Sequence, residues 1–216
     1  MTEPSPDARA RDLIADPRLL VDAVLPPVVF VVANAIGGLR TGAVAALGLS
    51  AVVLVIRLLR REGVLHALSG LGGVVVGVVV ALWSGDAAGF FLPGILTNAA
   101  MAVVSVVSIL ARRPLIAWTS AAIYRWPIEW YWHPRVRPAY SEITWAWAAL
   151  YAAKAVVQYL LAEAGQLGWL AVARIATGWP AFAVLLVVTY TYVGRRLAAL
   201  GGPSVDEYRE APAPQP

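Results

Sequence analysis

The sequence contains no cysteine and only two histidines. The absence of cysteine excludes disulfide bridges, thiolate-bound metals and a cysteine nucleophile. His66 and His133 fall in or beside predicted loops, whereas an intramembrane serine protease pairs a serine with a histidine inside its spans. The chain also lacks the paired histidines of a zinc metalloprotease and the clustered acids of a metal-dependent phosphotransferase. We therefore expect no enzymatic activity, no metal and no cofactor.

Charged residues are also scarce, at 14% of 216 residues, whereas hydrophobic residues make up 60% and the mean hydropathy is +0.70. Soluble proteins carry about 25% charged residues, so this composition predicts an integral membrane protein. A net charge of +4 would fit nucleic-acid binding, but the basic residues stand in short clusters between apolar runs, as membrane topology signals do. We expect membrane lipids and no nucleic acid as partners, and the sequence leaves the oligomeric state open.

Six stretches of the chain are long and apolar enough to cross a membrane. Each needs about 20 mostly apolar residues, because lipid offers no hydrogen-bond partner to an unpaired backbone group. The run from Pro114 has about ten apolar positions before Arg125, so we expect a short interfacial helix there. The predicted fold is an all-α integral membrane protein, a six-transmembrane helical bundle with this interfacial helix between spans 4 and 5. The predicted spans are 19–37, 41–59, 64–83, 90–110, 143–163 and 168–193.

The 17 basic residues divide unevenly among the predicted loops. Fourteen lie in the N-terminal segment, the second and fourth loops and the C-terminal tail. The other three loops contain Arg40 alone, while Lys154 and Arg174 fall inside predicted spans. By the positive-inside rule, this pattern predicts a multi-pass protein with both termini in the cytoplasm.

Composition divides the chain into three parts. Residues 1–18 are polar with charges of both signs, which predicts a cytoplasmic N-terminal segment and not a signal peptide. Residues 19–197 form the predicted six-span membrane domain. Residues 198–216 are rich in proline, glycine and acids, and we expect a disordered cytoplasmic tail because they cannot bury enough apolar surface.

A polar stripe interrupts the fifth predicted span. At 100° per residue, Trp147, Tyr151, Lys154 and Gln158 share a sector of about 60° on one helix face. A lysine at the centre of a membrane helix costs about 2.5 to 3.5 kcal/mol even on insertion scales, so the stripe must face the bundle, water or a partner. The acids in or beside the spans all fall near span ends, so the sequence names no carboxylate at this depth.

Three solutions remain for Lys154. Burial can leave the lysine neutral, neutral groups such as Tyr151 or Asn98 can hydrogen-bond to it, or an anionic guest can bind it. The first two are structural and the third is a functional pathway, and the residues leave the choice open. Lys154, Gln158, Tyr151 and Asn98 are therefore the candidate polar pathway or anion site.

Arg174 is a second cation within a predicted span. It lies about 9 Å along the helix, by helical rise, from the outer end of the sixth span. It can extend its side chain outward or pair with Glu163 across the short turn AGQLG. We interpret Glu163 and Arg174 as a candidate structural ion pair.

The long loop at 124–140 combines prolines, tryptophans, tyrosines and arginines. This composition suits the lipid headgroup zone, where aromatic rings lie half buried and arginines meet anionic lipid. We interpret it as an anchored loop, with a gate or a lipid-binding collar as the alternative.

Three strings resemble an actinobacterial membrane family known as domain of unknown function 3159. They are FFLPGILTNAAMAVVSVVSILARRPLIAW with the Trp-rich loop after it, ITWAWAALYAAKAVVQYLLAEAG and LGWLAVARIATGWPAF. The resemblance covers about residues 20–197. It implies a bacterial plasma membrane and supplies no activity, substrate or catalytic residue.

The cation at Lys154, for which the sequence names no carboxylate at the same depth, leads to the functional hypothesis. We expect a transporter-like activity toward a small anionic or lipid-headgroup species, with Lys154 as the charge partner and Gln158, Tyr151 and Asn98 orienting the ligand. The alternative is a non-catalytic structural or scaffold protein of the cell envelope, in which these residues only satisfy one another.

Overall fold

The computed structural model describes residues 17–60 and 64–210, and every regular element within these ranges is a helix. The all-α prediction is confirmed for this part of the chain. The N-terminal segment up to residue 16 and the last six residues lie outside the described residues. The helices are α2 (Pro17–Leu59), α3 (Val64–Ser84), the 3-10 helix η1 (Ala87–Phe90), α4 (Leu92–Leu110), α5 (Leu115–Tyr124), α6 (Ile128–Tyr131), α7 (Arg137–Glu163), α8 (Leu167–Ala176), α9 (Trp179–Leu200) and α10 (Val205–Glu210).

The helices gather into two compact units, which are described separately. Among the described residues, one unit comprises residues 17–60, 64–98 and 153–182, and the other comprises residues 99–152 and 183–210. We call them the Phe91 unit and the Trp130 unit, after a buried aromatic residue in each. Helices α4, α7 and α9 each contribute one end to each unit.

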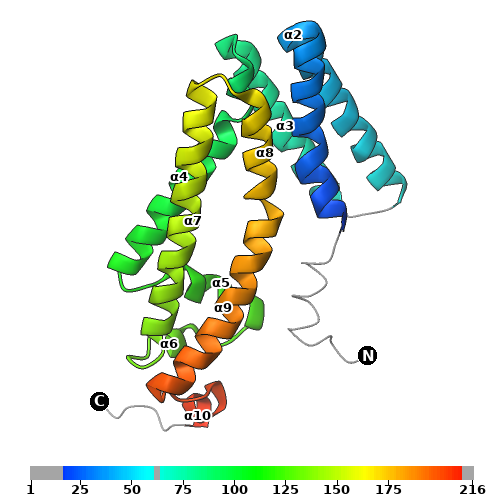
Figure 1. The fold of residues 1–216 in the computed structure, drawn as a ribbon. Helices are drawn as coiled ribbons and strands as arrows, with labels where there is room; N and C mark the ends of the chain where they lie inside the picture. The colour runs from blue at the N-terminus through cyan, green and yellow to red at the C-terminus, as the bar shows by residue number, and fades with distance from the viewer. Residues whose placement is uncertain (1–16, 61–63, 211–216) are drawn as a thin grey trace. The chain divides into compact units, whose positions relative to one another are not determined.

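Helix α2 is a hairpin of two arms in the Phe91 unit (Figure 1). Gly38 has φ 79° and ψ −178°, a conformation open essentially only to glycine, and the chain reverses there. The arms touch closely, since a Cβ on Gly42 would lie 2.9 Å from the carbonyl oxygen of Phe30. The break falls between the predicted spans 19–37 and 41–59.

A cluster of phenylalanines fills the core of the Phe91 unit. The rings of Phe30 and Phe90 stack at 4.2 Å, and Phe91 meets Phe90 edge-on at 5.2 Å. The close approach of α3 requires Gly77, because a Cβ there would lie 2.8 Å from the carbonyl oxygen of Phe90. Leu170 of α8 is fully buried in the same cluster. This packing fixes the turn η1, from which Phe91 enters the candidate site.

An aromatic cluster also forms the core of the Trp130 unit. Trp130 and Tyr131 of α6 pack edge-on at 4.9 Å, and Tyr140 of α7 packs against Tyr131 at the same distance. Burial raises the pKa of both tyrosines far above the usual range. Trp147 of α7 joins this cluster and donates its indole N–H to Thr189 Oγ1 at 3.0 Å.

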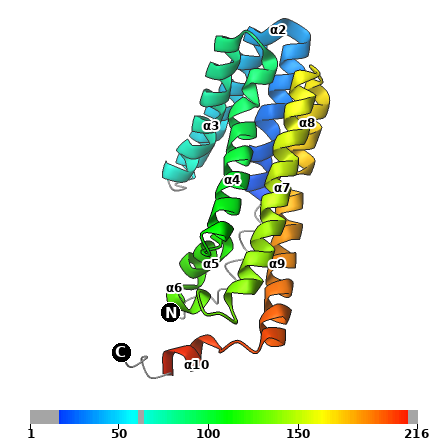
Figure 2. The same ribbon diagram turned by 90° about the vertical axis from the view of Figure 1, so that its left-hand side faces the viewer.

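The C-terminal segment differs from the predicted disorder over residues 198–210. Helix α9 continues to Leu200, and Ser204 then starts α10 in a capping box in which Ser204 Oγ accepts from Glu207 N at 3.1 Å. The Glu207 carboxylate accepts in return from Ser204 N at 2.7 Å. The indole of Trp130 donates to Pro203 O at 2.9 Å, so the segment docks on the aromatic cluster, and Figure 2 shows the chain turning after α9 into α10. These contacts supply the order that composition alone did not predict.

Within residues 17–60 and 64–210, three helical stretches are long and apolar enough to cross a membrane, Val24–Leu59, Leu92–Leu110 and Leu167–Leu200, whereas the sequence predicted six spans. Large apolar side chains on them stay exposed, including Ile36, Leu96 and Val184. Such continuous apolar surface is typical of helices that face lipid. The described part of the chain therefore has the character of a membrane-associated protein. The predicted short helix after Pro114 is present as α5.

Candidate functional site

The candidate site lies in the Phe91 unit, where α4, α7 and α8 carry polar side chains at apolar positions. Lys154 and Gln158 stand one turn apart on α7, Arg174 lies on α8, and Asn98 lies on the first half of α4. Of the four residues predicted as a polar pathway, the structure groups three in this unit. Tyr151 belongs to the Trp130 unit, where its ring lies 5.9 Å from that of Trp147.

The α7 face that carries Lys154 and Gln158 turns toward protein. Gln158 is fully buried and Lys154 is partly buried, whereas Val156, Val157 and Leu160 are exposed. This division follows the helical period, with apolar residues outward and the polar stripe inward. The α7 backbone therefore aims these two polar groups away from the apolar outer surface.

Arg174 is held between an aromatic ring and a glycine. Its guanidinium carbon lies 5.7 Å from the centre of the Phe91 ring, a cation–π contact. The guanidinium also lies against Gly94 of α4, where a Cβ would overlap Nη1 and lie 3.1 Å from Cζ. Among the described residues, no acceptor takes a hydrogen bond from this guanidinium. The group is thus fixed in position while its donors stay available.

The predicted ion pair between Glu163 and Arg174 does not form among the described residues. Glu163 ends α7 at the turn, and Gly165 reverses the chain there with φ 66°. Arg174 lies seven residues into α8 from Leu167, which is about 10 Å along the helix by rise. The carboxylate stays exposed at the turn, while the guanidinium reaches Phe91.

Asn98 lies one turn after Gly94 on α4. Its Nδ2 donates to Gly94 O at 2.9 Å, so the carboxamide folds back toward the residue that Arg174 contacts. The oxygen and nitrogen of an asparagine amide are assigned from such hydrogen bonds, and this bond fixes Nδ2 as the donor. Asn98 therefore borders the Arg174 guanidinium through the shared Gly94 backbone.

Gln158 brings a buried amide whose hydrogen bonds are incomplete. Its side chain is 1% exposed, and Oε1 accepts no hydrogen bond from any residue that the structure describes. Leaving such a group unpaired costs about 1 to 3 kcal/mol, so an unsatisfied amide in a folded core requires an explanation. Three residues further along α7, Leu161 packs against the phenylalanine core.

Two positive charges meet in this unit, because Arg174 lies near enough to Lys154 for the two to repel one another. A planar guanidinium with free donors binds an oxyanion through two parallel hydrogen bonds, and a nearby ammonium adds a point charge. Gln158 lies one turn from Lys154 on the same helix face, so the unit combines two cations with a buried amide. From the sequence we identified Arg174 but interpreted it as the ion-pair partner of Glu163. Nothing in the sequence indicated that Phe91 and Gly94 would contact its guanidinium.

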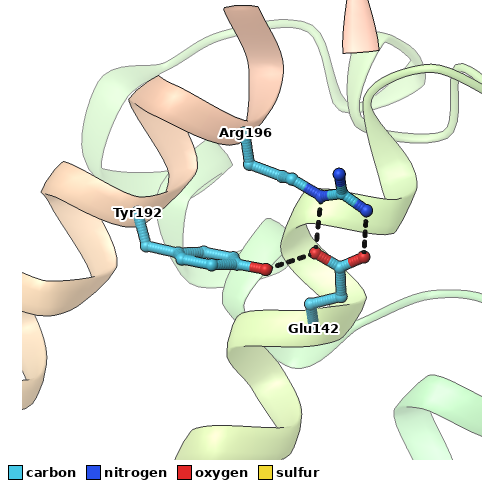
Figure 3. Close-up of polar contacts among 3 residues, drawn as sticks. All are labelled: Glu142, Tyr192 and Arg196. Atoms are coloured by element: carbon cyan, nitrogen blue, oxygen red, sulfur yellow. Dashed lines mark hydrogen bonds and ion pairs between the residues drawn. The ribbon is translucent and has the colours of Figure 1, made fainter. Parts of the chain in front are cut away.

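A second polar cluster, which the sequence analysis did not identify, lies in the Trp130 unit (Figure 3). Arg196 of α9 donates Nε and Nη2 to the two oxygens of Glu142 on α7, at 2.9 and 2.8 Å. The Tyr192 hydroxyl donates to Glu142 Oε2 at 2.5 Å. These hydrogen bonds, that of Arg196 first, hold the pKa of the Glu142 carboxyl below its usual range. The saturated carboxylate joins α7 to α9 and has a structural role.

Comparisons with known proteins identify the family. No curated protein and no solved structure matches the chain. One family model, described as a protein of unknown function (DUF3159), matches residues 16–199. That range includes the described residues of the Phe91 unit, those of the Trp130 unit up to residue 199, and every residue of the candidate site. The chain therefore belongs to the DUF3159 family.

Proposed function

We propose that this protein is a multi-pass plasma-membrane protein that binds a small oxyanion or an anionic lipid headgroup at Arg174, as part of a transporter-like activity. The observation that carries the proposal is the state of the guanidinium. It is clamped by Phe91 and Gly94, and its donors meet no acceptor among the described residues. An anion would satisfy those donors and offset the repulsion from Lys154.

Placing Arg174 within a membrane span has a free-energy cost that its contacts offset only in part. An arginine deep in a membrane helix costs about 2.5 to 3.5 kcal/mol on insertion scales. The cation–π contact with Phe91 returns about 0.5 to 2 kcal/mol. The buried, incompletely bonded Gln158 adds about 1 to 3 kcal/mol to the cost. A ligand that accepts from Arg174 and donates to Gln158 Oε1, such as a protonated phosphate ester, would offset both.

Each residue has a proposed role. Arg174 is the bidentate contact, Lys154 is a second charge, and Gln158 and Asn98 orient the ligand. Tyr151 remains a candidate from the sequence for the same pathway.

We infer six membrane passes with both termini in the cytoplasm. The two arms of α2, then α3, α4, α7 and the α8–α9 segment would supply the passes, and the break at Gly38 supports counting α2 twice. Because the chain has no cysteine, single-cysteine variants can be labelled without prior removal of others. We expect Ala164→Cys to react with an impermeant maleimide in intact cells, and Pro134→Cys only after permeabilisation. Labelling of both from the same side would refute this topology.

Ligand binding is tested by thermal shift of the purified protein against inorganic phosphate, acetate and phosphatidylglycerol. We expect one of these probes to raise the melting temperature of the natural protein, and we expect Arg174→Gln to lose the shift. Lys154→Met should weaken it, and Glu163→Gln, which alters a carboxylate remote from Arg174, should keep it. An equal shift in Arg174→Gln, or no shift from any probe, would refute the site.

The second candidate function is a non-catalytic scaffold of the cell envelope. One observation favours it: the Phe91 ring by itself compensates part of the charge of Arg174, so the residue could serve packing alone. In that case Arg174→Gln lowers the melting temperature and no probe raises it in either protein.

A further inference from the structure

The short helix α5 in the Trp130 unit is bracketed by two arginines in an unusual backbone conformation. Arg112, with φ 59°, and Arg125, with φ 55°, are the non-glycine residues of positive φ among those the structure describes. Each closes a helix: Arg112 follows α4, where Arg113 N donates to Ser108 O at 2.8 Å, and Arg125 is the C-cap of α5. Glycine is the usual residue in such left-handed caps because a side chain strains the backbone there. The chain accepts this strain at two arginines, which indicates that their side chains are needed.

The outer surface of α5 is apolar. Ala117 is buried against the aromatic cluster, whereas Trp118 is 48% exposed and Ile123 is 56% exposed. The helix has ten residues, about 15 Å, so it is too short to cross a bilayer. A short helix with an exposed aromatic and aliphatic side suits the boundary between headgroups and acyl chains.

Arginines and tryptophans meet on this surface. The guanidinium of Arg113 lies 5.6 Å from the ring centre of Trp132, and the rings of Trp132 and Trp118 are 5.7 Å apart. None of the guanidinium groups of Arg112, Arg113 and Arg125 donates a hydrogen bond or forms an ion pair within the described residues. Positive charge is thus displayed beside exposed apolar rings without an internal counter-ion.

We propose that this surface, the α5 face, docks on the bilayer and binds the phosphate groups of anionic phospholipids. Trp118 and Ile123 would enter the acyl boundary, and the three arginines would contact the headgroups. The α5 face is defined by Arg112, Arg113, Trp118, Ile123, Arg125 and Trp132. The occupant follows from charge complementarity, because residues 112–132 contain three arginines and one acid, Glu129, a net charge of +2. The proposal does not depend on an anion at Arg174.

The binding test uses the full chain in bilayers of phosphatidylcholine and phosphatidylglycerol, with either lipid dibrominated to quench nearby tryptophans. The readout is the affinity for phosphatidylglycerol relative to phosphatidylcholine. Each arginine near an anionic surface contributes about a fivefold preference, so loss of three removes up to about a hundredfold. We expect at least a tenfold fall in Arg112→Gln/Arg113→Gln/Arg125→Gln. The control Arg60→Gln/Arg195→Gln/Arg209→Gln makes the same change in net charge at exposed positions and should keep the preference.

A second pair of variants separates lipid binding from folding. Arg112→Gly and Arg125→Gly remove the side chain and relieve the left-handed strain. We expect each to raise the melting temperature in neutral detergent and to lower the preference for phosphatidylglycerol. The proposal would be overturned by an unchanged preference in the triple glutamine variant, or by a glycine variant that loses stability and keeps its lipid preference. An equal loss in the control triple variant would also overturn it, since net charge alone would then explain the effect.

Discussion

Replacing Gly94 by alanine moves Arg174 without removing its charge. A Cβ at residue 94 would overlap Nη1 and lie 3.1 Å from Cζ and 3.2 Å from Nη2 of the guanidinium. Contacts this short do not persist, so the flexible end of the arginine must move away from the added Cβ and leave its present position beside Phe91. The substitution is therefore a geometric perturbation of the proposed anion site.

The expected change in stability is small because opposing effects nearly cancel. Alanine gains about 1 kcal/mol over glycine in the interior of α4. Displacing the arginine costs about 0.5 to 1.5 kcal/mol for a strained rotamer and about 0.5 to 2 kcal/mol for the cation–π contact. The net loss is about 0 to 2.5 kcal/mol. Ligand affinity changes more steeply, because hydrogen bonds to a charged group are worth about 1.5 to 3 kcal/mol each, which is roughly tenfold or more in Kd.

The assay measures the ligand-induced shift in melting temperature for whichever probe, phosphate, acetate or phosphatidylglycerol, stabilises the natural protein. We expect Gly94→Ala to need at least tenfold more probe for the same shift. Gly168→Ala is the matched control, since it lies in α8 and no atom stands within 4 Å of the added Cβ. If Gly94→Ala binds the probe as tightly as Gly168→Ala does, the position of Arg174 does not determine binding and the reasoning fails.

Three further predictions test the fold. Glu142→Gln should lower the melting temperature at pH 7, and the difference from the natural protein should shrink as the pH falls below the unfolded-state pKa near 4.5. The lowered carboxyl pKa adds stability above that value, and this stability is lost as the pH falls through the folded-state pKa. A difference that stays constant as the pH falls would refute it. Trp130→Phe removes the hydrogen bond to Pro203 O and should lower the free energy of unfolding by about 1 kcal/mol. Proteolysis within residues 201–210 should then become faster, and an unchanged cleavage rate would contradict this prediction. Gly38→Ala should destabilise the protein by about 1 to 3 kcal/mol from backbone strain alone, because φ at residue 38 is positive. Gly48→Ala should not, because an added Cβ there also meets no atom within 4 Å and the backbone is helical.

The all-helical fold and two of its helix boundaries could be predicted from the sequence, whereas the count of six spans stays a prediction. The break at Gly38 separates two predicted spans, and Pro114 precedes a helix that begins at Leu115. Both features follow from local chemistry: a chain reversal needs glycine, and proline fits the start of a helix. Neither needs knowledge of which helices pack together.

Contacts between helices could not be predicted in the same way. The side chains of Tyr192 and Arg196 are four residues apart and share a face of α9, which the sequence displays, but their partner Glu142 lies 54 residues before Arg196. Arg174 had a nearby acid in the sequence, yet it reaches Phe91 because η1 turns that ring toward α8. The capping box at Ser204 is visible in the sequence as Ser-Val-Asp-Glu, but the prediction of disorder used composition alone.

Arg112 and Arg125, whose backbone is left-handed, stand where a helix end favours glycine. This conflict between residue type and backbone conformation can be seen in the sequence once the helix ends are known. Pro114 disfavours a helical conformation at Arg113, so α4 must close at or just before that residue. Local preference at the closing position is for glycine, and the chain has arginine at Arg112 and again at Arg125, where α5 ends before Trp126 and Pro127. A position that opposes local preference persists when another requirement is stronger. Arg112 and Arg125 carry the same charge and flank the same short helix, α5. We therefore ascribe their left-handed conformation to a shared anionic partner and not to folding.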